Sequence, residues 1–142
     1  MAFHLSVFLE NKPGRLEKIM KVLSENSINL RAMSLASSGD FGVTKLLVND
    51  PSKAFDELKK QKITVTKRKI AAVIIENVPG SFYELLKKLS EKGMNIEDCY
   101  GFLLNDGKTA VMVLEVENQP EAGTIMKDLG LNVLEDDKIY NY

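Results

Sequence analysis

The chain contains 142 residues and has a formal net charge of −1 at neutral pH, with 19 lysines and arginines against 20 aspartates and glutamates. This balance argues against a protein that coats nucleic acid or an anionic membrane, because both partners select a basic excess. The hydrophobic content of 44% is that of a chain that can bury a core. One cysteine excludes an internal disulfide, and a single histidine leaves no reason to expect a metal site or a cofactor. We expect a protein of the reducing cytoplasm without a membrane span, since no apolar run reaches about 20 residues.

The sequence repeats itself. Glu-Asn-Lys-Pro-Gly-Arg-Leu at residues 10–16 recurs as Glu-Asn-Val-Pro-Gly-Ser-Phe at residues 76–82. At the same offset, the apolar residues 16, 19, 20 and 23 fall on residues 82, 85, 86 and 89. Because the match continues without a gap, it indicates a duplication. We predict two domains, at residues 1–68 and 69–142.

In the first unit, apolar and polar side chains alternate over residues 3–9, which predicts a strand with one buried face. After the Pro-Gly turn, the apolar spacing of residues 16–23 predicts an amphipathic helix. Two apolar-rich strands joined by turn formers follow, at residues 28–36 and 41–48. A second helix begins at Asp-Pro-Ser, residues 50–52, where Asp suits the cap and Pro the first helical position. A last strand at residues 63–67 closes the unit.

The second unit repeats this order, with strands at residues 70–75, 95–104 and 109–117, a helix at residues 121–129 and an extended run at residues 131–134. Each unit is therefore predicted as β-α-β-β-α-β, so the fold class is α+β with two ferredoxin-like domains in tandem. The first and third strands of each unit should be central. No flexible linker separates the units, because the basic run at residues 67–69, which we interpret as a solvated junction, leads directly into a strand.

The sequence offers no catalytic set. His4 lies on a predicted strand away from any nucleophile motif, and Cys99 stands where the other unit has Met33, so both are interpreted as structural residues. No glycine-rich nucleotide-binding motif occurs. The third strands carry no aromatic platform on which bases stack, which disfavours nucleic acid as a partner. We therefore expect a protein that is not an enzyme and binds neither nucleic acid nor membrane.

Both units place Asn-x-Pro-Gly at the first strand-to-helix corner and an asparagine, Asn29 or Asn95, at the start of the second strand. Turn chemistry alone explains the corner. Asparagine is disfavoured in strands, however, so its repetition points to a ligand. A free amino acid needs N–H donors for its carboxylate and acceptors for its ammonium group. Gly14 and Gly80 leave the helix entrance open to such a ligand, and the asparagines supply donors and acceptors.

These motifs resemble those of ACT domains, regulatory modules that bind amino acids where two domains pair. The likeness covers the whole chain and rests on residues 10–16 with Ser-Ile-Asn-Leu at residues 27–30, and on residues 76–82 with Gly-Met-Asn-Ile at residues 93–96. Serine-sensing members carry a histidine two residues before the first asparagine. This chain has Leu9 and Ile75 there, which argues against serine as the ligand. The resemblance implies ligand-binding residues at both corners and both second strands: Asn11, Lys12, Pro13, Gly14, Arg15, Asn29, Asn77, Val78, Pro79, Gly80, Ser81 and Asn95.

The resemblance implies a non-catalytic regulatory protein that senses a free amino acid as a homodimer, the ligand favouring the associated state. A second hypothesis makes the chain a detached regulatory subunit of a biosynthetic enzyme, similar to the small subunit of acetohydroxy acid synthase. An enzyme is the third. Lys12 and Arg15 flank the first corner glycine, whereas Val78 and Ser81 flank the second. We therefore hypothesise that one kind of site binds ligand and the other supports assembly.

Overall fold

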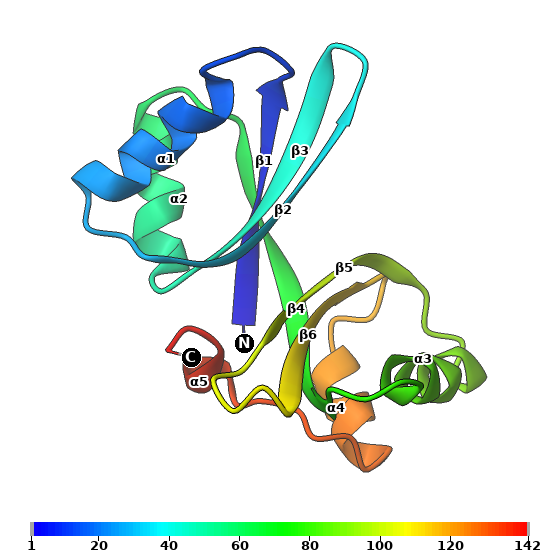
Figure 1. Ribbon diagram of the computed structural model, residues 1–142. Helices are drawn as coiled ribbons and strands as arrows, with labels where there is room; N and C mark the ends of the chain where they lie inside the picture. Colours follow the sequence, from blue (N-terminus) through cyan, green and yellow to red (C-terminus); the bar gives the residue numbers. More distant parts are fainter. Residues whose placement is uncertain (1, 142) are drawn as a thin grey trace. The chain divides into compact units, whose positions relative to one another are not determined.

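The computed structural model describes residues 2–141, so the outermost residues of the two predicted domains, 1 and 142, lie outside the described range (Figure 1). The chain forms two compact units, the first mainly Phe3–Arg68 and the second mainly Lys69–Tyr140. Strands and helices alternate along both. The predicted α+β fold class is therefore confirmed.

The first unit follows the predicted order of elements: β1 (Ala2–Glu10), α1 (Arg15–Glu25), β2 (Leu30–Ser38), β3 (Phe41–Val48), α2 (Pro51–Lys60) and the start of β4 (Val65–Glu76). Its strands lie side by side in the order β2-β3-β1-β4. β3 pairs antiparallel with both β1 and β2, and Leu5 of β1 stands opposite Leu46 of β3. In this unit β1 and β3 are therefore the central strands, as predicted.

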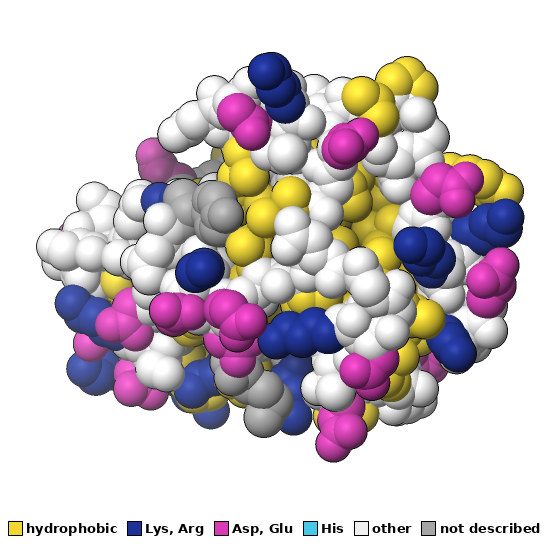
Figure 2. Space-filling model, turned by 90° about the horizontal axis from the view of Figure 1, so that it is seen from below, with side chains coloured by type: hydrophobic (Ala, Val, Ile, Leu, Met, Phe, Trp, Pro, Cys, Tyr) yellow, Lys and Arg dark blue, Asp and Glu magenta, His cyan; other side chains and the backbone are white. Residues whose placement is uncertain are grey.

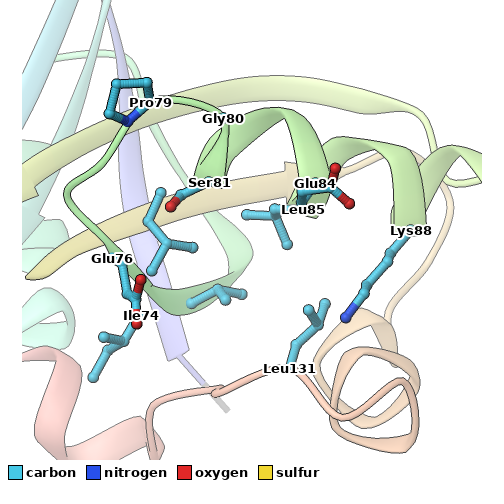
Figure 3. A pocket seen from close by; sticks show the side chains of 11 residues that line it. Ile74, Glu76, Pro79, Gly80, Ser81, Glu84, Leu85, Lys88 and Leu131 are labelled. Carbon is cyan, nitrogen blue, oxygen red and sulfur yellow. The ribbon is translucent and has the colours of Figure 1, made fainter.

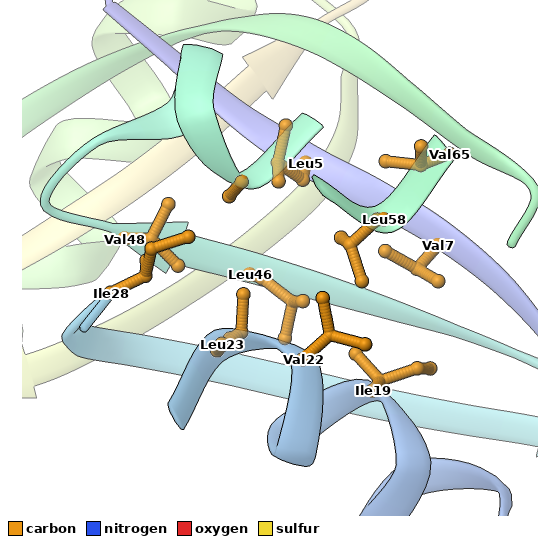
Figure 4. Close-up of a cluster of buried hydrophobic side chains, with 11 residues drawn as sticks. Leu5, Val7, Ile19, Val22, Leu23, Ile28, Leu46, Val48, Leu58 and Val65 are labelled. Atoms are coloured by element: carbon orange, nitrogen blue, oxygen red, sulfur yellow. The ribbon is translucent and has the colours of Figure 1, made fainter. Parts of the chain in front are cut away.

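Both helices of the first unit pack their apolar faces against the sheet. α2 begins at Pro51, behind Asp50, whose side chain accepts a hydrogen bond from the N–H of Lys53 at 3.0 Å. This is the cap that the sequence predicts. The resulting core is continuous from the sheet to both helices (Figure 4), and its labelled members are Leu5, Val7, Ile19, Val22, Leu23, Ile28, Leu46, Val48, Leu58 and Val65.

The second unit contains the rest of β4, then α3 (Ser81–Glu91), β5 (Ile96–Leu103), β6 (Thr109–Val116), α4 (Ala122–Asp128) and α5 (Asp136–Ile139). β6 lies between β4 and β5 and pairs antiparallel with each. A separate hydrophobic cluster fills the space between these strands and the helices α3 and α4. Each unit therefore has a core of its own. Cys99 packs against the second core, as its interpretation as a structural residue requires.

The strands expected at residues 63–67 and 70–75 are parts of one strand, β4. The basic run of Lys67, Arg68 and Lys69 therefore lies inside a strand, although all three side chains are exposed. The boundary was misplaced because the charged run breaks the apolar pattern without breaking the extended backbone. Solvent accepts charged side chains on an exposed strand as readily as on a loop.

The strand expected at residues 131–134 is reduced to a single bridge between Val73 and Val133. The reason is local. The N–H of Val133 donates to the carbonyl oxygen of Leu131 at 3.0 Å, which is a tight turn that competes with ladder pairing. The short helix α5 then follows, and no pattern in the sequence analysis predicted it.

The surface mixes both signs of charge. Figure 2 shows lysine and arginine side chains interspersed with aspartate and glutamate side chains on the face in view. This distribution agrees with the near-zero net charge of the chain.

Leu58 tests the core of the first unit. It is fully buried on α2, whereas Leu35 on β2 is 45% exposed. We expect Leu58→Ala to lower the free energy of unfolding by about 2–5 kcal/mol, because it removes buried methyl groups and leaves a cavity. The control Leu35→Ala should cost less than about 1 kcal/mol. Urea unfolding followed by circular dichroism measures both, and equal losses would contradict this core.

Candidate functional site

The two strand-to-helix corners have the same backbone geometry. Gly14 has a φ of 85° and Gly80 a φ of 90°, the left-handed region that glycine adopts without strain. A Cβ at either position would meet no atom within 4 Å, so the space in front of each glycine is open. Neither α1 nor α3 has a side-chain cap. The N–H groups of Arg15 and Ser81 donate to the carbonyl oxygens of Lys12 and Val78 at 3.3 Å. Within residues 2–141, the N–H groups of the next residues, Leu16 and Phe82, have no partner and remain available to a ligand or to water.

Asn11 and Asn77 tie each corner to the hairpin that follows the second strand. The Nδ2 of Asn11 donates to the carbonyl oxygen of Gly39 at 3.0 Å, and that of Asn77 donates to Gly107 at 3.2 Å. The donor of each amide thus serves the turn itself, which is the structural alternative left open by the sequence. Within residues 2–141, neither Oδ1 atom accepts a hydrogen bond. The acceptor of each amide is therefore unused by this part of the chain.

Asn29 and Asn95 stand just before β2 and β5, so the expectation that they open these strands is wrong. Their hydrogen bonds explain the difference. The N–H of Asn29 donates to Oδ1 of Asn49 at 2.9 Å, and Nδ2 of Asn95 donates to Oε2 of Glu117 at 2.7 Å. Both contacts are pairings between loops.

Asn29 lies at the far end of its sheet from the corner. The first residue of β2 pairs with Val48 at the end of β3, whereas Glu10, next to the corner, pairs with Phe41 at its start. The length of β3 between them is about 23 Å at roughly 3.3 Å per residue. Within one unit, Asn29 therefore does not meet Asn11. A joint site needs Asn29 from another domain, and this stays a prediction.

A pocket lies beside the corner in each unit. In the first unit it has a volume of about 660 Å³ and lies between the end of β1, the first turns of α1 and residues 62–64, which precede β4. In the second unit it has a volume of about 450 Å³ and lies between the end of β4, the first turns of α3 and Leu131. Figure 3 shows the side chain of Lys88 extending from α3 toward Leu131, with Glu76 and Ser81 nearer the corner. The repeat thus places a pocket at the same point of both units.

Some of the predicted site residues line these pockets and others do not. Arg15 lines the first pocket, while the second includes Pro79, Gly80 and Ser81. Gly14 lines a separate pocket along α1, which shares Lys18 with the first pocket. The remaining corner residues lie outside the two main pockets: Asn11, Lys12, Pro13, Asn77 and Val78.

The sequence analysis missed several pocket residues. Lys18 on the predicted helix and Phe8 on the predicted first strand were given no role there, yet both line the first pocket. Lys62 and Phe41 come from distant parts of the chain and complete the same pocket. The alignment of the two repeats could have drawn attention to Lys18. It falls on Glu84, a residue of opposite charge that lines the second pocket.

Ion pairs hold the rim of the first corner. Oε2 of Glu10 lies 3.0 Å from Nζ of Lys12, and its Oε1 lies 3.6 Å from a guanidinium nitrogen of Arg15. The hydrogen bond and charge of Lys12, together with the charge of Arg15, lower the pKa of the Glu10 carboxyl below its usual value. Glu10 is therefore an anion at neutral pH, and its charge is shared by two cations.

Phe41 at the start of β3 stacks on Phe8 of β1, with ring centroids 5.1 Å apart and an angle of 24° between the ring planes. About half of each ring is exposed. The sequence analysis did not predict this exposed aromatic pair, because it combines residues from two strands that become neighbours only through the sheet register.

The two residues considered for catalysis lie outside both main pockets. His4 is buried on β1. Cys99 on β5 is half-buried, and burial together with the nearby Asp98 carboxylate raises the pKa of its thiol to about 11. A thiol with such a pKa is almost entirely protonated at neutral pH and is a poor nucleophile. No helix within residues 2–141 is long and apolar enough to cross a membrane.

Solved structures of other proteins share the fold described above. The crystal structure of protein BT0572 from Bacteroides thetaiotaomicron is 34% identical, covers 99% of this chain and 96% of its own, and superposes with a TM-score of 0.91. The regulatory subunits of aspartate kinase from Thermus thermophilus and Thermus flavus are each 17% identical over 91% of this chain and 93% of their own, with TM-scores of 0.67 and 0.60. These two likenesses show a shared fold. No curated protein matches the sequence.

The sequence also matches the family described as the ACT domain pair, over residues 1–141. This match spans both units, both corners and both pockets described above. The chain belongs to the ACT domain pair family.

Proposed function

We propose that this chain is a non-catalytic, cytoplasmic regulatory protein that binds a free amino acid and works as a homodimer, with one ACT domain at residues 1–68 and the other at residues 69–142. The observation that carries the proposal is the pairing, in both units, of an uncapped helix start with an adjacent pocket. The positive end of a helix attracts a carboxylate, and its free N–H groups can donate to it. The pocket beside it offers space for the side chain of the ligand.

The asparagines of the corner fit this role without giving up their structural one. Asn11 and Asn77 use their amide donors to hold the turn, and each keeps an Oδ1 acceptor that can receive a hydrogen bond from an ammonium group. Asn29 and Asn95 would add to a site only from a second domain, in keeping with ligand sites at ACT–ACT interfaces. Ligand binding across such an interface would stabilise the associated state by mass action.

The alternative, a detached regulatory subunit of an amino-acid biosynthetic enzyme, draws support from the fold shared with aspartate kinase regulatory subunits. Affinity purification of the chain from its own cells separates the two hypotheses. A larger catalytic chain recovered in fixed proportion would favour the subunit. Recovery of the chain with itself alone would favour the independent sensor.

Calorimetric titration of the full chain with each of the twenty common amino acids tests amino-acid binding directly. We expect at least one amino acid to bind, at one molecule per chain, because the two corners differ in charge. At 100 times its Kd, that ligand should raise the free energy of unfolding by about 2.7 kcal/mol, and sedimentation should show a larger dimer fraction. Absence of binding by all twenty would contradict amino-acid sensing, and two molecules per chain would contradict the division of roles.

Substitutions at Asn11 distinguish its role in the turn from its proposed role in ligand binding. Asn11→Ala and Asn11→Asp both remove the Nδ2 donor to Gly39, so both should lower the free energy of unfolding, by about 0.5–1.5 kcal/mol. Only the alanine variant also removes the acceptor proposed for the ammonium group. We therefore expect affinity to fall about tenfold for Asn11→Ala and to be kept in Asn11→Asp. Equal affinity in the wild type and both variants would show that Asn11 serves the turn alone.

The raised pKa of Cys99 makes the non-catalytic proposal testable. At pH 8, a thiol of pKa about 11 should react with iodoacetamide on the order of 100-fold more slowly than free cysteine, because the thiolate is the reactive form. The rate should rise as the pH approaches 11. Mass spectrometry of the intact chain follows the modification. Rapid alkylation at pH 7 would instead reveal an activated thiol and would argue for catalysis.

A further inference from the structure

The pockets of the two units occupy equivalent positions but carry opposite charge. Three cations line the first pocket, Arg15, Lys18 and Lys62, against the single carboxylate of Glu10. The second pocket has two carboxylates, from Glu76 and Glu84, against the single cation Lys88 (Figure 3). At matching points of the repeat, Lys18 corresponds to Glu84 and Arg15 to Ser81. The reversal therefore follows from substitutions at the pocket itself.

The one carboxylate of the first pocket does not neutralise its cations. Glu10 is already committed to Lys12 and Arg15, at 3.0 and 3.6 Å. Among residues 2–141, neither Lys18 nor Lys62 takes part in an ion pair. Two unpaired ammonium groups thus border a concave surface, and such a surface concentrates anions.

The backbone of Lys62 is in a conformation that disfavours lysine. Lys62 follows the last residue of α2 and its cap, with a φ of 60° in the left-handed region. At the same point after α4 the chain has Gly130, with a φ of 77°. Glycine adopts this conformation without strain and is the usual residue after a helix end. Stability alone therefore favours glycine at position 62, so a glycine substitution there removes the ammonium group without a cost in stability.

Phe8 and Phe41 form the apolar part of the same pocket. The two stacked rings are absent from the second unit, where Ile74 stands at the position of Phe8. Thr109 stands at the position of Phe41, because it pairs with Glu76 as Phe41 pairs with Glu10. An apolar surface beside charged groups excludes water and lowers the local dielectric, so the attraction between a ligand carboxylate and nearby ammonium groups becomes stronger. An excess of cations and a pair of stacked rings thus occur together in the first pocket, and both are missing from the second.

We propose that the pocket of the first unit binds an acidic amino acid, and that Lys62, with Lys18, recognises its side-chain carboxylate. The proposal rests on the proposed function, which supplies the α-carboxylate at the start of α1 and the ammonium group at Oδ1 of Asn11. The second pocket, with its excess of carboxylates, repels the same ligand. The ligand of this chain is thereby one molecule of aspartate or glutamate, bound in the first unit.

The test titrates the full chain with L-aspartate and L-glutamate, and with L-asparagine and L-glutamine as neutral analogues of the same shape. We expect one of the acids to bind at least about tenfold more tightly than its amide, because the amide removes a charge-assisted contact. Inorganic phosphate serves as a generic anion and should compete weakly. Higher salt should weaken binding of the acid, since the contacts lie at the surface.

The variant Lys62→Gly distinguishes an effect on ligand affinity from an effect on the stability of the fold. The glycine variant should keep or raise the melting temperature, because it relieves the left-handed backbone, while it lowers affinity for the acid about tenfold. Ser27→Gly is the matched control. Ser27 follows α1 with a φ of 56° but lies outside the first pocket, so the change should relieve the same strain and leave affinity unchanged. Lys62→Arg keeps the charge and should retain binding.

The outcomes distinguish this inference from the proposed function. If a neutral amino acid binds and Lys62→Gly leaves its affinity unchanged, the acidic ligand is wrong and the amino-acid sensor stands. If phosphate binds as tightly as the acids, the pocket is a general anion surface and the inference is overturned. If no amino acid binds, the proposed function fails and the inference fails with it.

Discussion

The strand-to-helix corner is the constraint on which the rest of this structure depends. The chain must leave the end of a central strand and enter a helix within four residues, and the left-handed glycine at the last of them makes that reversal possible. A glycine at the cap position offers no side chain to the first turn of the helix. The same residue that closes the turn therefore leaves backbone donors open beside a pocket. The turn thus requires Gly14 and Gly80, and the proposed ligand site would use the space that they leave open.

A comparison of the two repeats shows that the backbone fixes where each pocket lies, whereas the side chains set its charge. Each unit buries its own core and places a pocket beside its own corner, so the location of the pockets follows from the ACT fold. Their charge does not, because Lys18 and Glu84 stand at matching positions with opposite sign. A helix surface next to solvent accepts either charge at little cost to stability. The repeats could therefore diverge in the charge of their pockets while both kept the fold.

The asparagines of the corner illustrate why a short motif supports two interpretations. Asn11 and Asn77 donate to the following hairpin, as a purely structural motif would require. Within residues 2–141, however, the Oδ1 acceptor of each amide receives no hydrogen bond. An amide side chain has both donors and an acceptor, so an asparagine whose donor holds a turn still has an acceptor. The low identity to aspartate kinase regulatory subunits limits that likeness to the fold.

Periodicity and the repeat were enough to predict the α+β class, the order of strands and helices in the first unit and the two corners, because these depend on neighbours within a few residues. The continuity of β4 and the loss of a last strand at residues 131–134 were not predictable, since exposed charge and a competing local turn leave no period in the sequence. The first pocket needed the tertiary structure most of all. Phe41 and Lys62 reach Phe8 and Lys18 only because the register of β1 with β3 and the return of the chain after α2 bring these residues together. Contacts between residues so far apart in the sequence are set by packing of the whole unit, and no local pattern records them.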